Sequence, residues 1–225
     1  MSRSGAQTFI YDNPVAIAAH VSIVGPKEGK GPLADWFDVI LDDDLLGQKS
    51  WELAESEMVR RAADTPAAAI FLLGGSILTL PEMIRIAHDG GKRAFVHIDL
   101  AEGLGRDEAA VRWCVENLGA DGVISTKAGL LKTASELGAI TIQRMFLMDS
   151  TSFEHGKRML RNTPPHMAEV LPGIAPKAIR ELCSALEKPV IAGGLITDPQ
   201  EITLALQAGA TAVSAGDEKL WKIGF

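Results

Sequence analysis

The sequence predicts a single-domain α/β protein with a TIM-like (β/α)8 barrel, and three observations support this fold class. Short apolar runs without polar alternation recur along the chain, as is typical of parallel strands buried on both faces. Segments with the periodicity of amphipathic helices, about 3.6 residues, lie between most of these runs. Eight apolar runs occur in 225 residues, a length that suits one large α/β domain.

The expected strands are short, and several of them stop at a charged residue or at a glycine. In chain order they are Val15–His20, Ala69–Leu73, Ala94–Asp99, Gly122–Thr126, Ile140–Gln143, Met167–Leu171, Val190–Ala192 and Thr211–Ser214.

The expected helices have recognisable starts and ends. Thr79 shortly before Pro81, and Thr197-Asp198 before Pro199, place a capping residue close to a proline of the first helical turn. Glycines follow several helices, as in C-terminal caps. The helices are Glu52–Ala63, Pro81–Asp89, Asp107–Leu118, Gly129–Leu137, Ser152–Asn162, Pro176–Ala185 and Pro199–Ala208.

The segment Gly25–Thr65 is too long for one crossover between strands. It opens with a stretch rich in glycine, proline and lysine, and Phe37–Leu41 is either a ninth strand or an inserted packing element. We therefore expect residues 1–225 to form one barrel domain that carries residues 25–65 as an insertion or extended loop-helix segment.

Composition excludes some classes of protein. Hydrophobic residues make up 47% and charged residues 23%, which indicates a globular protein with a full core. The net charge of −7 disfavours binding of nucleic acid or anionic membrane through overall charge, although a local basic patch stays possible. Cys114 and Cys183 lack metal-type spacing, and no signal-peptide or membrane-spanning segment occurs, so we expect a cytoplasmic protein.

Charged residues and tight turns follow the expected strands. Since the carboxyl ends of parallel strands converge on one face of a barrel, these residues are expected to surround one pocket. The expected ligand-binding residues are Asp99, Glu102, Lys127, Arg144, Glu169 and Gly173.

Asp99 is the strongest of these candidates, because burying a carboxylate without a partner is costly. His97 faces the same side of the strand, and either a ligand contact or a hydrogen-bonded core histidine explains it. Asp99 and Glu102 can together bind a divalent cation, or Glu102 can cap the next helix. Neither reading of Glu102 prevails, and no other metal site is expected.

The two basic residues allow more than one role. Lys127 can bind phosphate, form a Schiff base or neutralise Asp99, and neutralisation is the simplest. Arg144 can bind a carboxylate or a phosphate through its guanidinium, or form a structural bridge to Asp149.

A phosphate site is expected at the last two strand–helix loops, where backbone amides can approach an anion. The alternative is that the glycines there only make tight turns. The expected residues are Gly193, Gly194, Ser214, Ala215 and Gly216.

Several motifs in combination resemble one family. They are His97-Ile-Asp-Leu-Ala-Glu-Gly-Leu104, Asp121-Gly-Val-Ile-Ser-Thr-Lys127, Thr141-Ile-Gln-Arg144, Phe146-Leu-Met-Asp-Ser150, Glu169-Val-Leu-Pro-Gly173, Ile191-Ala-Gly-Gly-Leu-Ile196 and Leu220-Trp221. From about Phe71 to Trp221 the chain is similar to the glycerol-3-phosphate-responsive antiterminators of bacterial glycerol operons.

The resemblance implies a TIM-like barrel that binds glycerol 3-phosphate and then leader mRNA, preventing termination of glycerol-metabolism transcripts. It implies phosphate at the glycine loops, and glycerol near Asp99, Lys127, Arg144 and Glu169. Two features depart from the family pattern: Ser214-Ala-Gly216 replaces a Ser-Thr-Ser type turn, and Gly25–Thr65 is longer. We expect a homo-oligomer without a cofactor and without enzymatic activity.

Basic residues that could face RNA cluster at Arg60-Arg61, at Lys157-Arg158 with Arg161, and at Lys177 with Arg180. All lie on expected helices, where solvated faces are the usual explanation. Two alternatives to the RNA-binding regulator stay open. One is an enzyme, a lyase, isomerase or metal-assisted phosphodiesterase acting on a small phosphorylated polyol through Asp99, Glu102 and Lys127. The other is a ligand-binding barrel that regulates through protein contacts.

Overall fold

The structure of this chain is a computed structural model. It describes residues 47–223 in full and, before residue 47, only the backbone of five short strands. Among the described helices, none is both long and apolar enough to cross a membrane.

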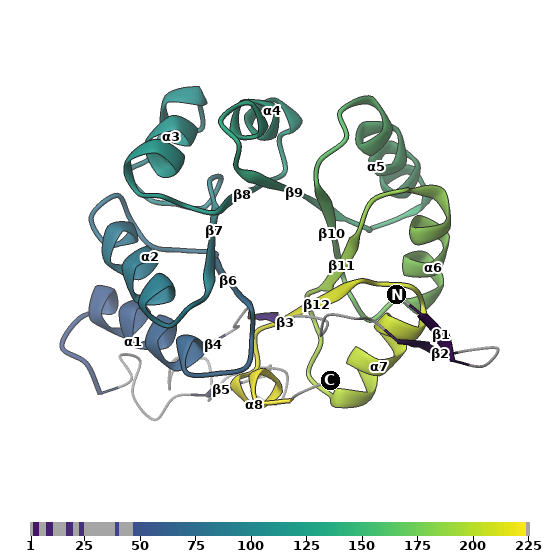
Figure 1. Ribbon diagram of the computed structural model, residues 1–225, viewed down its shortest axis with the longest axis horizontal. Coiled ribbons are helices and arrows are strands. Elements are labelled where there is room, and N and C mark those ends of the chain that lie inside the picture. The colour runs from purple at the N-terminus through teal and green to yellow at the C-terminus, as the bar shows by residue number, and fades with distance from the viewer. Residues whose placement is uncertain are drawn as a thin grey trace.

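Seven parallel strands of the fully described region curl around a common interior, with helices on the outside (Figure 1). They are β6 (Ala69–Leu72), β7 (Arg93–His97), β8 (Gly122–Ser125), β9 (Ile140–Phe146), β10 (Met167–Leu171), β11 (Val190–Gly193) and β12 (Ala212–Ala215). The predicted α/β class and parallel sheet are therefore confirmed.

The backbone of β3 (Ile17–Ala19) lies between β12 and β6 and pairs with both, which gives the order of a closed barrel, β10-β11-β12-β3-β6-β7-β8-β9. The predicted strand Val15–His20 contains β3. Since only the backbone of this strand is described, the complete (β/α)8 repeat stays a prediction.

The helices follow the strands in the expected alternation. They are α1 (Trp51–Ala63), α2 (Leu80–Asp89), α3 (Glu108–Arg112), which continues as a π-helical segment η3 (Trp113–Asn117), α4 (Ala128–Glu136), α5 (Ser150–Asn162), α6 (Pro176–Ala185), α7 (Pro199–Gln207) and α8 (Glu218–Trp221).

Side-chain caps explain several helix starts. Asp149 and Asp198 each form a capping box with the residue at the third helical position, and Asp107 accepts a hydrogen bond from the backbone of Ala110. Pro176 and Pro199 lie in the first turns of α6 and α7, where a missing N–H is tolerated.

Within the Gly25–Thr65 segment the structure describes the backbone of Val39–Ile40 and residues 47–65, which contain α1 as expected. The backbones of β4 (Ile23–Val24) and β5 (Val39–Ile40) pair in a separate two-stranded sheet, so the run Phe37–Leu41 does not supply a barrel strand. β1 (Ser2–Ser4) and β2 (Thr8–Ile10) form another two-stranded sheet. The stretch rich in glycine, proline and lysine at the start of the segment lies outside the described residues.

The barrel interior is apolar toward the amino ends of the strands. Its buried residues are Phe71, Phe95, Ile124, Ile142 and Ile191. The rings of Phe71 and Phe95 lie 5.4 Å apart between centroids and are tilted by 60°. A Cβ atom at Gly122 would come within 2.4 Å of the Phe95 ring, so glycine is required for this packing.

Candidate functional site

A polar layer lies directly above the apolar layer, at the carboxyl ends of the strands. Because side chains alternate between the two faces of a strand, the residue two positions after an interior apolar residue also faces the interior. His97 follows Phe95 in this way, Arg144 follows Ile142 and Glu169 follows Met167. All three polar side chains are buried.

Arg144 and Glu169 form a buried ion pair at the centre of this layer. Neighbouring strands β9 and β10 place the two residues directly opposite each other, and Arg144 Nε lies 2.6 Å from Glu169 Oε2. Ser214 Oγ on β12 donates to the other carboxylate oxygen, Glu169 Oε1, at 2.8 Å. The carboxylate is therefore held from two sides, and the guanidinium is fixed in orientation by its Nε group.

Gly193 makes room for this arrangement. A Cβ atom there would lie 2.2 Å from Ser214 Oγ and 2.8 Å from Glu169 Oε1. Thus the glycine that the sequence assigned to phosphate binding is required, at this position, by the packing of Glu169 and Ser214. Ser214, which the sequence also assigned to phosphate binding, donates its hydroxyl proton to Glu169 instead.

Asp99 lies just beyond β7 and is anchored through one carboxylate oxygen. Asp99 Oδ2 accepts hydrogen bonds from Ser125 Oγ at 2.9 Å, from the Thr126 backbone N–H at 2.7 Å and from Thr126 Oγ1 at 3.2 Å. Ser125 Oγ in turn accepts from the Lys127 backbone N–H at 2.9 Å. The end of β8 therefore orients this carboxylate while leaving its second oxygen uncommitted.

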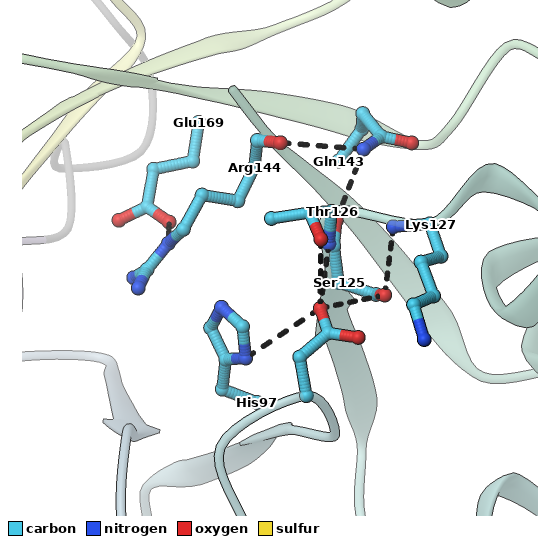
Figure 2. Close-up of polar contacts among 8 residues, drawn as sticks. His97, Ser125, Thr126, Lys127, Gln143, Arg144 and Glu169 are labelled. Atoms are coloured by element: carbon cyan, nitrogen blue, oxygen red, sulfur yellow. Dashed lines mark hydrogen bonds and ion pairs between the residues drawn. The ribbon is translucent and has the colours of Figure 1, made fainter. Parts of the chain in front are cut away.

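His97 lies between the two groups, with its Nδ1 atom 3.9 Å from Asp99 Oδ2 (Figure 2). Burial of the ring and the nearby positive charge of Arg144 lower the pKa of His97 from 6.5 to about 4, against the opposing effects of Asp99 and Glu169. The imidazole is therefore neutral near pH 7.

Four buried side-chain atoms make no hydrogen bond to any described group: His97 Nδ1, Asp99 Oδ1, Gln143 Oε1 and Arg144 Nη2. Leaving a buried polar atom unpaired costs about 1–3 kcal/mol, so such atoms are rare and call for an explanation. Figure 2 shows the guanidinium of Arg144 directed toward the ring of His97, whereas the amide oxygen of Gln143 points away from both. The other three atoms belong to residues grouped around His97, which lies near Asp99 and feels the charges of both Asp99 and Arg144.

These three atoms define what a ligand must offer. As a carboxylate oxygen, Asp99 Oδ1 can only accept a hydrogen bond, so it requires a donor such as a hydroxyl group. Arg144 Nη2 can only donate, and therefore requires an acceptor such as a hydroxyl or phosphate oxygen. A neutral His97 Nδ1 can do either, depending on its tautomer. A small polyol, or its phosphate ester, satisfies all three.

Glu102 and Lys127 lie at the same end of the barrel, but they are exposed. The backbone of Glu102 joins two loops, since its N–H donates to Gly75 O and its carbonyl accepts from the Ile77 N–H. Its side chain does not cap α3, because the N-cap of that helix is Asp107. Lys127 forms no ion pair with Asp99, whose nearest basic partner among residues 47–223 is His97. In the same range, no group of three or more histidine, cysteine or acidic residues could hold a metal ion.

The loops after β10 and β11 lie against each other at this end of the barrel. The Gly173 N–H lies 2.6 Å from the Gly193 carbonyl oxygen and 3.0 Å from that of Gly194. Gly194 and Leu195 both have positive φ, at 76° and 61°, which is unusual for leucine. The N–H groups of Thr197 and Asp198 donate to Glu201, so only the start of this loop can offer amides to an anion.

Ala215 and Gly216, the other half of the expected phosphate site, are buried. The Ala215 carbonyl accepts a hydrogen bond of 2.9 Å from Trp221 Nε1, which ties the end of β12 to α8.

A cavity of about 260 Å³ lies elsewhere, between α1, β6 and Trp221. Its lining is mostly apolar apart from Glu55, whose pKa is raised by burial and by the nearby charge of Glu102. None of the described atoms that lack a hydrogen-bond partner line it. We therefore place the candidate site at the polar layer, where specific recognition groups converge.

Two residues of the site have roles that the sequence does not specify. The sequence allows either a ligand contact or a core histidine at His97, and it predicts a phosphate contact at Ser214, whose hydroxyl instead donates to Glu169. The two-residue spacing along a strand could have identified both residues, because each lies two positions after a residue that faces the interior. Asp149 caps α5 and is not the partner of Arg144, which pairs with Glu169.

Comparison with known proteins supports the same family along most of the chain. The family model "Glycerol-3-phosphate responsive antiterminator" matches residues 52–221. YgcP of Escherichia coli, described as uncharacterized, is 33% identical over 169 residues, covering 75% of this chain and 88% of that protein.

Two solved structures are similar in fold and sequence. The glycerol uptake operon antiterminator regulatory protein of Listeria monocytogenes has a TM-score of 0.71 and 29% identity, covering 74% of this chain and 90% of that one. A glycerol uptake operon antiterminator-related protein of Thermotoga maritima has a TM-score of 0.66 and 32% identity, covering 74% and 93%.

The amino-terminal part has a different likeness. The family model "Stage V sporulation protein AD" matches residues 5–70, and the protein of that name from Bacillus subtilis is 36% identical over 64 residues, 28% of this chain and 19% of that protein. The two family matches overlap at residues 52–70, which contain most of α1 and the start of β6. From residue 52 to residue 221, the chain belongs to the family of glycerol-3-phosphate responsive antiterminators.

Proposed function

We propose that this protein is a glycerol-3-phosphate-responsive transcription antiterminator, which binds leader mRNA and regulates genes of glycerol metabolism. The observation that carries the ligand part of this proposal is the set of unpaired atoms on His97, Asp99 and Arg144. The RNA part is supported by family membership.

In the proposed complex, the glycerol hydroxyls contact Asp99 Oδ1 and His97 Nδ1, and an oxygen of the ligand accepts from Arg144 Nη2. Glu169 acts indirectly, because its carboxylate already binds Arg144 Nε and Ser214 Oγ and thereby holds the guanidinium in place. Lys127, which is exposed at the end of β8, lies where it can approach an anionic ligand from solvent.

The phosphate group is proposed to lie at the loops after β11 and β12, with Gly194 offering its backbone and Arg144 sharing the charge. Gly173 supports this loop through its contacts with the carbonyls of Gly193 and Gly194. The Ser214-Ala-Gly216 turn takes part through its backbone, because the hydroxyl of Ser214 already serves Glu169.

The remaining expectations belong to the same proposal. They are a complete eight-stranded barrel within one domain of residues 1–225, a cytoplasmic location, a homo-oligomer, and regulation without catalysis. They rest on the composition of the chain and on its family.

Calorimetric titration with glycerol 3-phosphate, alongside glycerol and inorganic phosphate, tests the ligand. We expect saturable binding that is tighter for glycerol 3-phosphate than for either fragment, because each fragment satisfies only some of the unpaired atoms. Equal affinity for phosphate alone would contradict a role for Asp99 and His97, and absence of binding to all three would contradict the proposed ligand.

A further inference from the structure

The charge on the outer surface is unevenly distributed among the described helices. Counting Lys and Arg against Asp and Glu, α5 has three basic residues and one acidic residue, and α6 has two basic residues and one acidic residue. The helices α1, α2 and α7 each carry more acidic than basic residues, and α4 and α8 are balanced. In a chain with a net charge of −7, α5 and α6 are the described helices with a positive balance.

The two basic helices are neighbours on the outside of the barrel (Figure 1). Lys157 Nζ on α5 lies 3.4 Å from Glu181 Oε1 on α6, which joins the two helices directly. Their charges therefore combine into one surface, the α5–α6 face, which we define by the exposed residues Arg158, Arg161, Lys177 and Arg180.

These four residues differ from most basic residues on the other described helices. Among the described residues, none of the four forms an ion pair or a side-chain hydrogen bond as donor. In contrast, Arg60 and Arg61 pair with Glu57 and with acids of other helices, Arg85 pairs with Glu82 and Asp89, and Lys132 pairs with Glu136. The unpaired cations of the α5–α6 face are therefore available to an anionic partner.

The spacing of the four residues suits a phosphate chain. Arg158 and Arg161 are three residues apart on α5, as are Lys177 and Arg180 on α6, so each pair projects from one side of its helix. Arginine binds phosphate through two parallel N–H groups, and lysine binds it as a point charge. Two such pairs on adjacent helices can follow several consecutive phosphates of a nucleic-acid backbone.

The α5–α6 face is also directly connected to the ligand site. β9 carries Arg144 and leads into α5, and β10 carries Glu169 and leads into α6. The helix α5 lies close against β9 at Gly156, where a Cβ atom would overlap the side-chain methyl of Met145. A ligand that draws Arg144 or Glu169 into new contacts thus acts on the two strands that support this surface.

From these observations we infer that the α5–α6 face is the RNA-binding surface, which contacts the sugar-phosphate backbone of the leader mRNA. This inference rests on the proposed function for the identity of the partner. The surface itself is argued from charge, pairing and position.

The test compares two variants of the full chain that lose the same charge. The test variant carries Arg158→Gln, Arg161→Gln, Lys177→Gln and Arg180→Gln. The control carries Arg60→Gln, Arg61→Gln, Arg85→Gln and Lys132→Gln, which removes four cations that are paired and lie on other helices. Fluorescence anisotropy with a labelled leader RNA of a glycerol-utilisation operon, with saturating glycerol 3-phosphate and at several salt concentrations, measures the affinity.

We expect the test variant to lose at least tenfold in RNA affinity, and the control to stay within about threefold of the wild type. Each phosphate contact on single-stranded RNA contributes about 0.7 to the slope of log affinity against log salt, so the slope should fall by about 3 in the test variant alone. Calorimetry should show unchanged glycerol 3-phosphate binding in both variants, since none of the substituted residues lies in the ligand site.

If the wild-type protein binds the RNA, the proposed function stands. In that case, unchanged RNA affinity in the test variant, or an equal loss in both variants, would overturn the assignment of the surface. Failure of the wild-type protein to bind the RNA would instead overturn the proposed function, and the assigned surface with it.

Discussion

The polar side chains at the two ends of the barrel are paired to different extents. At the amino ends of the strands, Asp121 Oδ2 accepts from the Ala94 N–H and pairs with His88 Nε2, each at 2.8 Å. Thr141 Oγ1 lies 2.9 Å from His166 Nδ1 and accepts from the His166 backbone N–H at 3.0 Å. At the carboxyl ends, His97, Asp99 and Arg144 each keep a buried atom without a partner.

The difference separates stability from function within one fold. The polar groups at the amino ends connect neighbouring strands through hydrogen bonds. At the carboxyl ends, Asp99 and Arg144 are each held by one part of the side chain while another part remains unpaired. Such partial pairing fixes the position of a recognition group while leaving it able to bind.

The largest effect is expected from Arg144→Met. This change removes the cation that pairs with the fully buried Glu169, and an uncompensated buried charge costs about 3–5 kcal/mol. We expect a loss of that size in the free energy of unfolding, measured by urea denaturation, together with loss of ligand binding.

Two further variants make this prediction specific. Arg85→Met removes an exposed cation from two ion pairs on α2, and because solvent screens such pairs it should change the free energy of unfolding far less than Arg144→Met. Combining Arg144→Met with Glu169→Gln should restore part of the stability without restoring ligand binding. Recovery of binding in that double variant would contradict a direct contact between Arg144 and the ligand.

The pH dependence of stability should reveal His97. Its pKa is about 4 in the folded protein and 6.5 ordinarily, so between these values the unfolded chain binds a proton that the folded protein does not. The stabilising contribution is complete above pH 6.5 and is lost as the pH falls toward 4, by up to about 3 kcal/mol.

His97→Asn should flatten this part of the pH profile of the unfolding free energy. Asp99, Arg144 and Glu169 act on His97 and remain in the variant, so the difference between the two profiles isolates the histidine. His155→Asn, at an exposed position on α5, is the matched control for the loss of a histidine ring outside the polar layer. A flat difference profile for His97→Asn would contradict a buried neutral imidazole.

Asp99→Asn should separate binding from stability. An asparagine oxygen can keep the acceptor role toward Ser125 and Thr126, while the amide nitrogen replaces the unpaired acceptor Oδ1 with a donor. We expect the unfolding free energy to change by less than about 1.5 kcal/mol and the affinity for glycerol 3-phosphate to fall at least about tenfold. Unchanged affinity in the folded variant would exclude Asp99 from the site.

The smallest effect is expected at the other end of the barrel. Thr141→Val removes the hydroxyl that serves His166 and should lower the unfolding free energy by about 1 kcal/mol. Calorimetry should show unchanged ligand affinity. A loss of affinity comparable to that of Asp99→Asn would mean that the two ends of the barrel do not differ in the way described.

The strands and helices could be largely predicted because their apolar patterns are local. Met167–Leu171 and Pro176–Ala185 were predicted with the bounds that the structure has. The end of β9 could not be predicted, because the strand continues to Phe146 past the buried Arg144, whose charge is paired with Glu169 on the neighbouring strand. That partnership joins residues 25 positions apart in sequence.

Part of the candidate site could be predicted, because a charged residue at the end of a strand is also a local signal. Charged residues at strand ends pointed to Asp99, Arg144 and Glu169, which the structure places in or beside the polar layer. The sequence could not distinguish them from Glu102 and Lys127, because exposure depends on how the loops fold. The role of Gly193 beside Ser214 also depends on a contact between two different strands.

A crystal structure of the protein with glycerol 3-phosphate tests the central claim most directly. We predict ligand oxygens at hydrogen-bond distance, about 3 Å, from Asp99 Oδ1, His97 Nδ1 and Arg144 Nη2. A ligand bound in the cavity beside Trp221, or one that leaves these three atoms without contact, would contradict it.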